Sequence, residues 1–237
     1  MTAGDAENQT AAPPWRKGIV TYIALAAILV GYPAFRMAVA YFDLFPTADS
    51  SDRWWGLWSV ILVGHWLCAG VVLAAIASEK TTLASVGLDI SIFIKGRWGV
   101  LLVLFAAVAA AYYAPSYYYG DEIPEQMRSH PLGPVTAAQR VFWILMAVTA
   151  GFVEELLYRG YAITRLRNLV GLPAAMFIAI ASFALMHGPS AFEPQFLGLY
   201  VVSGAIFTFL FVAMKCRRLE ALIIFHAVTD MMLLAAP

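Results

Sequence analysis

Residues 151–160 read Gly-Phe-Val-Glu-Glu-Leu-Leu-Tyr-Arg-Gly, and this stretch decides the fold because it places three charges inside an apolar segment. Each charge costs about 2.5 to 3.5 kcal/mol at the centre of a bilayer. Glu154, Glu155 and Arg159 must therefore face a protein interior or a water-filled cavity, where ionisable groups are functional by default. The stretch predicts a membrane helix surrounded by other helices.

The spacing of these charges separates their roles. Glu155 and Arg159 are four residues apart with the acid first, so they share a helix face in the favourable order for an ion pair. Glu154 lies about 100° away around an α-helix. We therefore expect Arg159 to neutralise Glu155, and Glu154 to be left free as the candidate for chemistry.

The composition places the whole chain in a membrane. Of its 237 residues, 62% are hydrophobic and only 13% are charged, and the mean hydropathy is +0.75. Soluble domains typically carry about a quarter charged residues, so an integral membrane protein is expected, with the lipid bilayer as its surroundings. The net charge is zero and the basic residues are scattered, which argues against a nucleic-acid partner.

The apolar runs predict an all-α, polytopic transmembrane bundle of about seven spans. We expect a disordered cytoplasmic tail at 1–17, N-terminal transmembrane helices in 18–135 and a catalytic transmembrane core in 136–237. A signal peptide is the rival interpretation of the first apolar run, and a retained span is favoured. The expected spans cover about residues 18–41, 54–78, 98–119, 137–168, 171–187, 196–214 and 219–236.

The loop charges predict the orientation. Ten lysines and arginines fall on the side of the N-terminus and three on the other side, so the N-terminus is expected in the cytoplasm. The protein would then be a multi-pass protein of the plasma (inner) membrane. The ten are Arg16, Lys17, Lys80, Lys95, Arg97, Arg165, Arg167, Lys215, Arg217 and Arg218, and the three are Arg53, Arg128 and Arg140.

Two further helices carry polar groups at membrane depth. Phe183 and His187 are four residues apart, as are His226 and Asp230, so each pair shares one helix face. A rise of about 1.5 Å per residue places Glu154, His187, His226 and Asp230 between roughly 12 and 24 Å from the inner ends of their helices. The three helices can therefore bring two acids and two imidazoles together.

The three patterns, taken in order, resemble a known family. Glu-Glu-x-x-x-Arg, Phe-x-x-x-His and His-x-x-x-Asn/Asp on successive helices are the motifs of the CAAX-protease and bacteriocin-processing (Abi) family, which includes the type II CAAX prenyl endopeptidases. The resemblance implies that Glu154 activates the attacking water. It implies that Glu155 and Arg159 support it, and that the groups that orient the water and stabilise the tetrahedral intermediate are His187, His226 and Asp230.

The expected function is an intramembrane endopeptidase that hydrolyses a peptide bond of a membrane-associated protein or peptide. The mechanism is either glutamic-type or metal-dependent, because two histidines and a carboxylate could hold a divalent metal such as Zn²⁺. Prenyl endopeptidases carry Asn where this chain has Asp230, and this difference argues against a prenylated peptide as substrate more than against the enzyme class. His65 has no partner at motif spacing and is interpreted as structural.

The alternative function is non-catalytic. An ion- or proton-coupled transporter, or a membrane scaffold, could use the same buried polar groups. A transporter would more often show two related halves with broken helices, whereas here the polar motifs are concentrated in one half.

Overall fold

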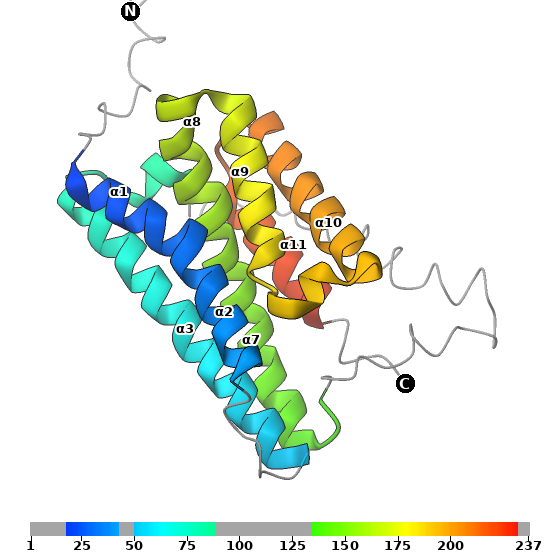
Figure 1. Ribbon diagram of the computed structural model, residues 1–237. Helices are drawn as coiled ribbons and strands as arrows, with labels where there is room; N and C mark the ends of the chain where they lie inside the picture. Colours follow the sequence, from blue (N-terminus) through cyan, green and yellow to red (C-terminus); the bar gives the residue numbers. More distant parts are fainter. Residues whose placement is uncertain (1–17, 43–49, 89–133, 232–237) are drawn as a thin grey trace, which may run out of the picture.

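The computed structural model describes residues 18–42, 50–88 and 134–231, and every regular element in these ranges is helical (Figure 1). Within them, four helices are long and apolar enough to cross a membrane. These are Ile19–Tyr41, Ser51–Ser78, Ala137–Val170 and Phe196–Ala213, and Leu172–Leu185 is a shorter apolar helix. The predicted all-α bundle is confirmed to this extent. The predicted tail at 1–17 and the predicted span at 98–119 lie outside the described residues.

The helix at the centre of the fold is α7 (Ala137–Glu154), which continues without interruption as η3 (Glu155–Ile163) and α8 (Thr164–Val170). A capping box starts it, because the Thr136 hydroxyl accepts from the Gln139 backbone N–H while the Gln139 side chain accepts from the Thr136 N–H. Gly171, at φ +83°, ends it. The single long helix predicted over 137–168 is thus confirmed, but its middle segment η3 is a π-helix.

The other elements surround this helix (Figure 1). Helix α3 runs alongside α7, and α11 packs against α7 as well. The starts of the predicted spans after residue 168 agree with the structure within two residues. The bounds are α1 Ile19–Ala26, η1 Ala27–Gly31, α2 Tyr32–Tyr41, α3 Ser50–Ser78, η2 Leu83–Val86, α9 Leu172–Leu185, η4 Gly188–Phe192, α10 Pro194–Ala213 and α11 Leu219–Met231.

A proline explains the π-helical segment η1 between α1 and α2. Pro33 has no N–H, so the carbonyl of Leu29 loses its usual helical donor, and the Ser182 hydroxyl donates to it at 2.9 Å. The Tyr32 N–H reaches back to Ala27, which leaves the Ile28 carbonyl free for the Tyr158 hydroxyl at 3.4 Å. Each displaced carbonyl therefore has a side-chain donor, as a lipid environment requires.

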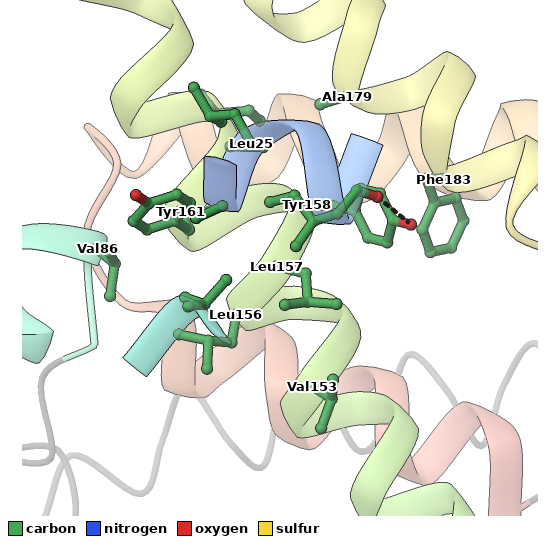
Figure 2. Packing of buried hydrophobic residues seen from close by; sticks show 14 of the residues in the cluster. Leu25, Val86, Val153, Leu156, Leu157, Tyr158, Tyr161, Ala179 and Phe183 are labelled. Atoms are coloured by element: carbon green, nitrogen blue, oxygen red, sulfur yellow. Dashed lines mark hydrogen bonds between the residues drawn. The ribbon is translucent and has the colours of Figure 1, made fainter. Parts of the chain in front are cut away.

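The apolar core is built around η3 (Figure 2). Leu156, Leu157, Tyr158 and Tyr161 are fully buried there and pack against α1, α9 and η2. Because this helix has protein on all sides, its charged residues do not meet lipid. The expectation drawn from residues 151–160 is confirmed.

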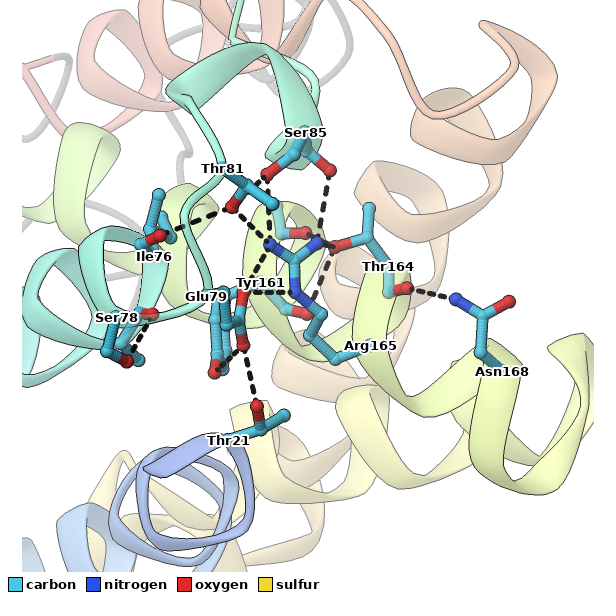
Figure 3. Close-up of polar contacts among 12 residues, drawn as sticks. Thr21, Ile76, Ser78, Glu79, Thr81, Ser85, Tyr161, Thr164, Arg165 and Asn168 are labelled. Atoms are coloured by element: carbon cyan, nitrogen blue, oxygen red, sulfur yellow. Dashed lines mark hydrogen bonds and ion pairs between the residues drawn. The ribbon is translucent and has the colours of Figure 1, made fainter. Parts of the chain in front are cut away.

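A buried polar network closes the end of the bundle where α8 lies (Figure 3). The Arg165 guanidinium binds Glu79 Oε2 through two nitrogens, at 2.8 and 3.0 Å. The hydroxyls of Thr21 and Tyr161 donate to Glu79 Oε1, at 2.8 and 2.9 Å. Both oxygens of this carboxylate are thus occupied, and the network ties α1 and the end of α3 to η3 and α8.

Helices α7 and α11 approach each other closely at Gly151. A Cβ atom at this position would lie 2.7 Å from the Ile223 carbonyl oxygen and 2.8 Å from the Ala227 backbone nitrogen. Both atoms belong to the α11 backbone and cannot move aside alone. The absence of a side chain at residue 151 therefore sets how near α11 stands to Glu154 and Glu155.

We expect Gly151→Ala to lower the free energy of unfolding by about 1 to 3 kcal/mol, because overpacking forces the two helices apart. Denaturant unfolding of the purified protein in detergent would measure this. Gly70→Ala is the matched control, since a Cβ at Gly70 meets nothing within 4 Å, and it should unfold like the parent protein. Equal stability of the two variants would contradict the close approach.

Candidate active site

The two glutamates lie at the junction between α7 and η3. Glu154 is the last residue of α7 and Glu155 the first of η3, and both are buried. π-Helical turns are rare and frequently mark functional sites. The two carboxylates leave the helix in different directions, so each has a partner of its own, and they share His226.

Glu155 is paired with Arg159, as its spacing predicted. Arg159 Nη1 lies 2.9 Å from Glu155 Oε1, and both side chains are almost fully buried. Arg159 Nη2 donates to the Gly204 carbonyl of α10 at 3.2 Å. Its guanidinium also lies over the Phe183 ring of α9, 4.2 Å from the centroid, where a cation–π attraction adds to the pair. The arginine thereby links η3 to α9 and α10.

His226 brings α11 to both glutamates. Its Nδ1 lies 2.8 Å from Glu155 Oε1, and because an ionised carboxylate only accepts, Nδ1 carries the proton. The other ring nitrogen, Nε2, lies 3.6 Å from Glu154 Oε2 and 3.7 Å from Asp230 Oδ2. Three acidic side chains therefore surround one imidazole.

His187 lies at the edge of this group. Its Nδ1 donates to the Phe183 carbonyl at 3.0 Å, so Nε2 is an acceptor in the neutral ring. The ring stacks on Tyr200 of α10 with centroids 3.8 Å apart. It interacts electrostatically with Glu154 and His226, but among the described residues it makes no direct hydrogen bond to either.

The expectation that Glu154 is left free was wrong. Its Oε1 is bonded to His65 Nε2 of α3 at 3.1 Å. His65, which was interpreted as structural because it has no partner at motif spacing, is the residue that binds Glu154. No spacing links residues 65 and 154, which are 89 positions apart. The one available signal was that a histidine in the middle of an apolar span marks a functional site by default.

The remaining oxygen of Glu154 is open. Oε2 has no hydrogen-bonded partner among the described residues, and its near neighbour is His226 Nε2. A carboxylate held by one oxygen and open at the other can take a proton from a water molecule. Imidazoles beside it can donate to a developing oxyanion in a site of low dielectric. The arrangement suits hydrolysis by an activated water.

A metal ion fits this arrangement less well. In the described part of the chain, no group of three or more histidine, cysteine, aspartate and glutamate side chains is arranged to hold one. The atoms left for such an ion would be the two Nε2 atoms, because Nδ1 of His226 and of His187 already has an acceptor, and Glu154 Oε1 is bonded to His65. No step of the mechanism below is therefore routed through a metal.

A comparison with known proteins gave a match that covers most of the helices that carry these residues. The family model described as type II CAAX prenyl endopeptidase Rce1-like matches residues 136–232. The comparisons with curated proteins and with solved structures gave no match. The matched segment holds α7 to α11, whereas His65 lies outside it. The apolar helices and this match together describe an integral membrane protein of the protease class. Residues 136–232, which are less than half of the chain, are thus similar to the type II CAAX prenyl endopeptidase Rce1-like family.

Proposed function

We propose that this protein is an intramembrane endopeptidase in which Glu154 activates the attacking water. The observation that carries the proposal is the position of Glu154 Oε2, which faces His226 Nε2 at 3.6 Å without a hydrogen-bonded partner among the described residues. The family match supports peptide-bond hydrolysis as the reaction. In this proposal residues 136–237 form the catalytic core, and 18–135 supply the helices that enclose it.

The reaction needs one proton acceptor that later becomes a proton donor. Glu154 Oε2 takes a proton from water while the water oxygen attacks the carbonyl carbon of the scissile bond. The carbonyl electron pair moves to its oxygen, where His187 and His226 stabilise the negative charge through Nε2–H, each ring then being protonated on both nitrogens because its Nδ1–H is already donated. The carbon–nitrogen bond then breaks, and Glu154 returns its proton to the leaving nitrogen. No covalent enzyme intermediate forms.

The other polar residues support this step. Arg159 neutralises Glu155, and Glu155 fixes the His226 ring through Nδ1. That bond directs Nε2 toward Glu154 and Asp230. Asp230 is partly exposed, its side chain retaining 30% of its accessible surface, so it can contact a bound substrate.

The proposed substrate is a membrane-associated protein or peptide. The family description suggests a prenylated C-terminal peptide as the first candidate. A comparison of membrane proteins and peptides from cells that carry the native chain or Glu154→Gln would find the substrate directly. Species cut only by the native chain are substrates, and a prenylated and an unprenylated peptide with the same cleavage site would then test the lipid requirement.

Glu154→Gln should lower kcat by about 10²- to 10⁴-fold while folding is kept, because the amide preserves shape but cannot accept the proton. Turnover by purified enzyme and its thermal unfolding in detergent would measure both effects. Near-normal turnover would show that the assigned base is wrong.

Glu155→Gln and Glu79→Gln are matched comparisons for that variant. Each removes a buried carboxylate from a buried arginine, which costs about 3 to 5 kcal/mol of stability. Glu155→Gln should also reduce turnover, because His226 loses its acceptor. Glu79→Gln should reduce stability alone, with kcat per folded molecule unchanged.

Asp230→Asn should keep substantial activity and resist chelators. An amide can donate to the oxyanion or to His226 without needing a proton of its own, and it is a much poorer zinc ligand than a carboxylate. Turnover by the purified variant, with and without a chelator, is the measurement. A dead variant that regains activity with added Zn²⁺ would favour a metal mechanism over the one proposed.

The proposed membrane arrangement is seven spans with a cytoplasmic N-terminus, in the plasma membrane. Single cysteines at Asp121 and Arg217, in a protein without Cys68 and Cys216, should react with impermeant reagents from opposite sides. Labelling in intact cells and in inverted vesicles would measure this. Reaction of both positions in intact cells would overturn the arrangement.

A further inference from the structure

His65 is a buried histidine that no motif includes, and it contacts the proposed base. It lies in the middle of α3, 1% exposed, and its Nε2 is 3.1 Å from Glu154 Oε1. On the other side of the ring, Nδ1 lies 2.8 Å from the Tyr32 hydroxyl and 2.9 Å from the Ile61 carbonyl. The ring is thus held from three directions.

The direction of the His65–Glu154 hydrogen bond follows from the chemistry of the acceptor. An ionised carboxylate has no proton to give, so the N–H must be on His65 Nε2. Nδ1 then either accepts from the Tyr32 hydroxyl or, in a doubly protonated ring, donates to the Ile61 carbonyl. In both cases Nε2 donates to Glu154.

The His65 imidazole is held in one orientation, and it holds the Glu154 carboxylate in turn. The Tyr32 ring meets His65 edge-on, with centroids 5.4 Å apart and planes at 74°, so the imidazole cannot rotate without losing its partners. Its N–H therefore holds Oε1, and the carboxylate cannot turn about its terminal bond. Oε2 is left on the side of His226 and Asp230. A misplacement of about 1 Å at such a group can cost about 10²-fold in rate.

We propose that His65, oriented by Tyr32, is the positioning residue that presents Glu154 Oε2 to the attacking water. This rests on the proposed function, since it assigns His65 a part in that reaction. It also gives the N-terminal helices a role in the site, because α2 and α3 lie outside the matched segment 136–232. The residue acts through Glu154 and does not itself touch the substrate.

A purely structural role makes a different prediction. The Glu79–Arg165 network also ties helices together, but there both oxygens of the carboxylate are occupied. His65 occupies one oxygen of Glu154 and leaves the other open. A structural tie affects stability, whereas a positioning residue affects kcat per folded molecule.

The test uses full-length enzyme in lipid nanodiscs and a synthetic peptide. The peptide carries the cleavage site that the comparison of the native chain with Glu154→Gln identifies. His65→Leu should lower kcat by about 10²-fold, with KM changed less than about threefold. His65→Gln can place an amide N–H near the former Nε2, so it should recover at least about a tenth of the parent kcat. If His65→Leu does not fold, the kcat of His65→Gln still tests the role of His65.

The contact between Tyr32 and His65 is tested by a separate pair of variants, Tyr32→Phe and its control Tyr161→Phe. Tyr32→Phe removes the hydroxyl beside His65 Nδ1 and should lower kcat several-fold. Tyr161 is also buried, and Tyr161→Phe removes the hydroxyl that donates to Glu79, so it should lower thermal stability with kcat unchanged. Equal kcat in these two variants would overturn the role of Tyr32.

The outcomes separate this inference from the proposed function. If the parent enzyme cuts and His65→Leu keeps its kcat, the inference fails and the proposed function stands. If no species is cut by the parent enzyme, the proposed function fails and His65 has no reaction to support. The nitrogen-15 resonances of His65 should also move on Glu154→Gln without any substrate, and unmoved resonances would show that the contact is absent.

Discussion

The ion pair between Glu155 and Arg159 is the interaction on which the rest of the site depends. Arg159 reaches the Gly204 carbonyl of α10 and the Phe183 ring of α9, and Glu155 holds His226 of α11. One pair on the central helix therefore positions the three helices that follow it. A buried pair is costly unless further bonds satisfy it, and here those bonds are the contacts that assemble the site.

The two π-helical segments show how a lipid environment shapes the backbone around this pair. Pro33 disturbs the first helix, and the displaced carbonyls are satisfied by Tyr158 of η3 and by Ser182 of α9. The disturbed helix thus bonds directly to the segment that begins at Glu155. The same helix carries Tyr32, which contacts His65. The irregularity that the proline causes therefore lies beside the polar site and contributes to its support.

The sequence predicted what depends on local spacing and missed what depends on tertiary contact. The apolar runs predicted the described helices, and i, i+4 spacing predicted the Glu155–Arg159 pair and the approach of Asp230 to His226. The π-helix had no such signal, because an α-helix and a π-helix of the same residues share their hydrophobic pattern. The His65 contact joins residues that only the packing of α3 against α7 brings together. Its absence from the motifs made Glu154 look unpaired.

The protons of the site follow from counting donors and acceptors. The Nδ1–H of His226 donates a hydrogen bond to Glu155, while Nε2 faces oxygens of Glu154 and Asp230. A hydrogen bond across either gap requires a proton on Nε2 or on one of those carboxylates, because a lone pair cannot bond to a lone pair. Hydrolysis needs a group that takes a proton from water and another that donates to the oxyanion. With Oε1 of Glu154 held by His65, Oε2 is the open acceptor of that carboxylate and can take the proton from water. A proton on the neighbouring Nε2 of His226 supplies the donor to the oxyanion.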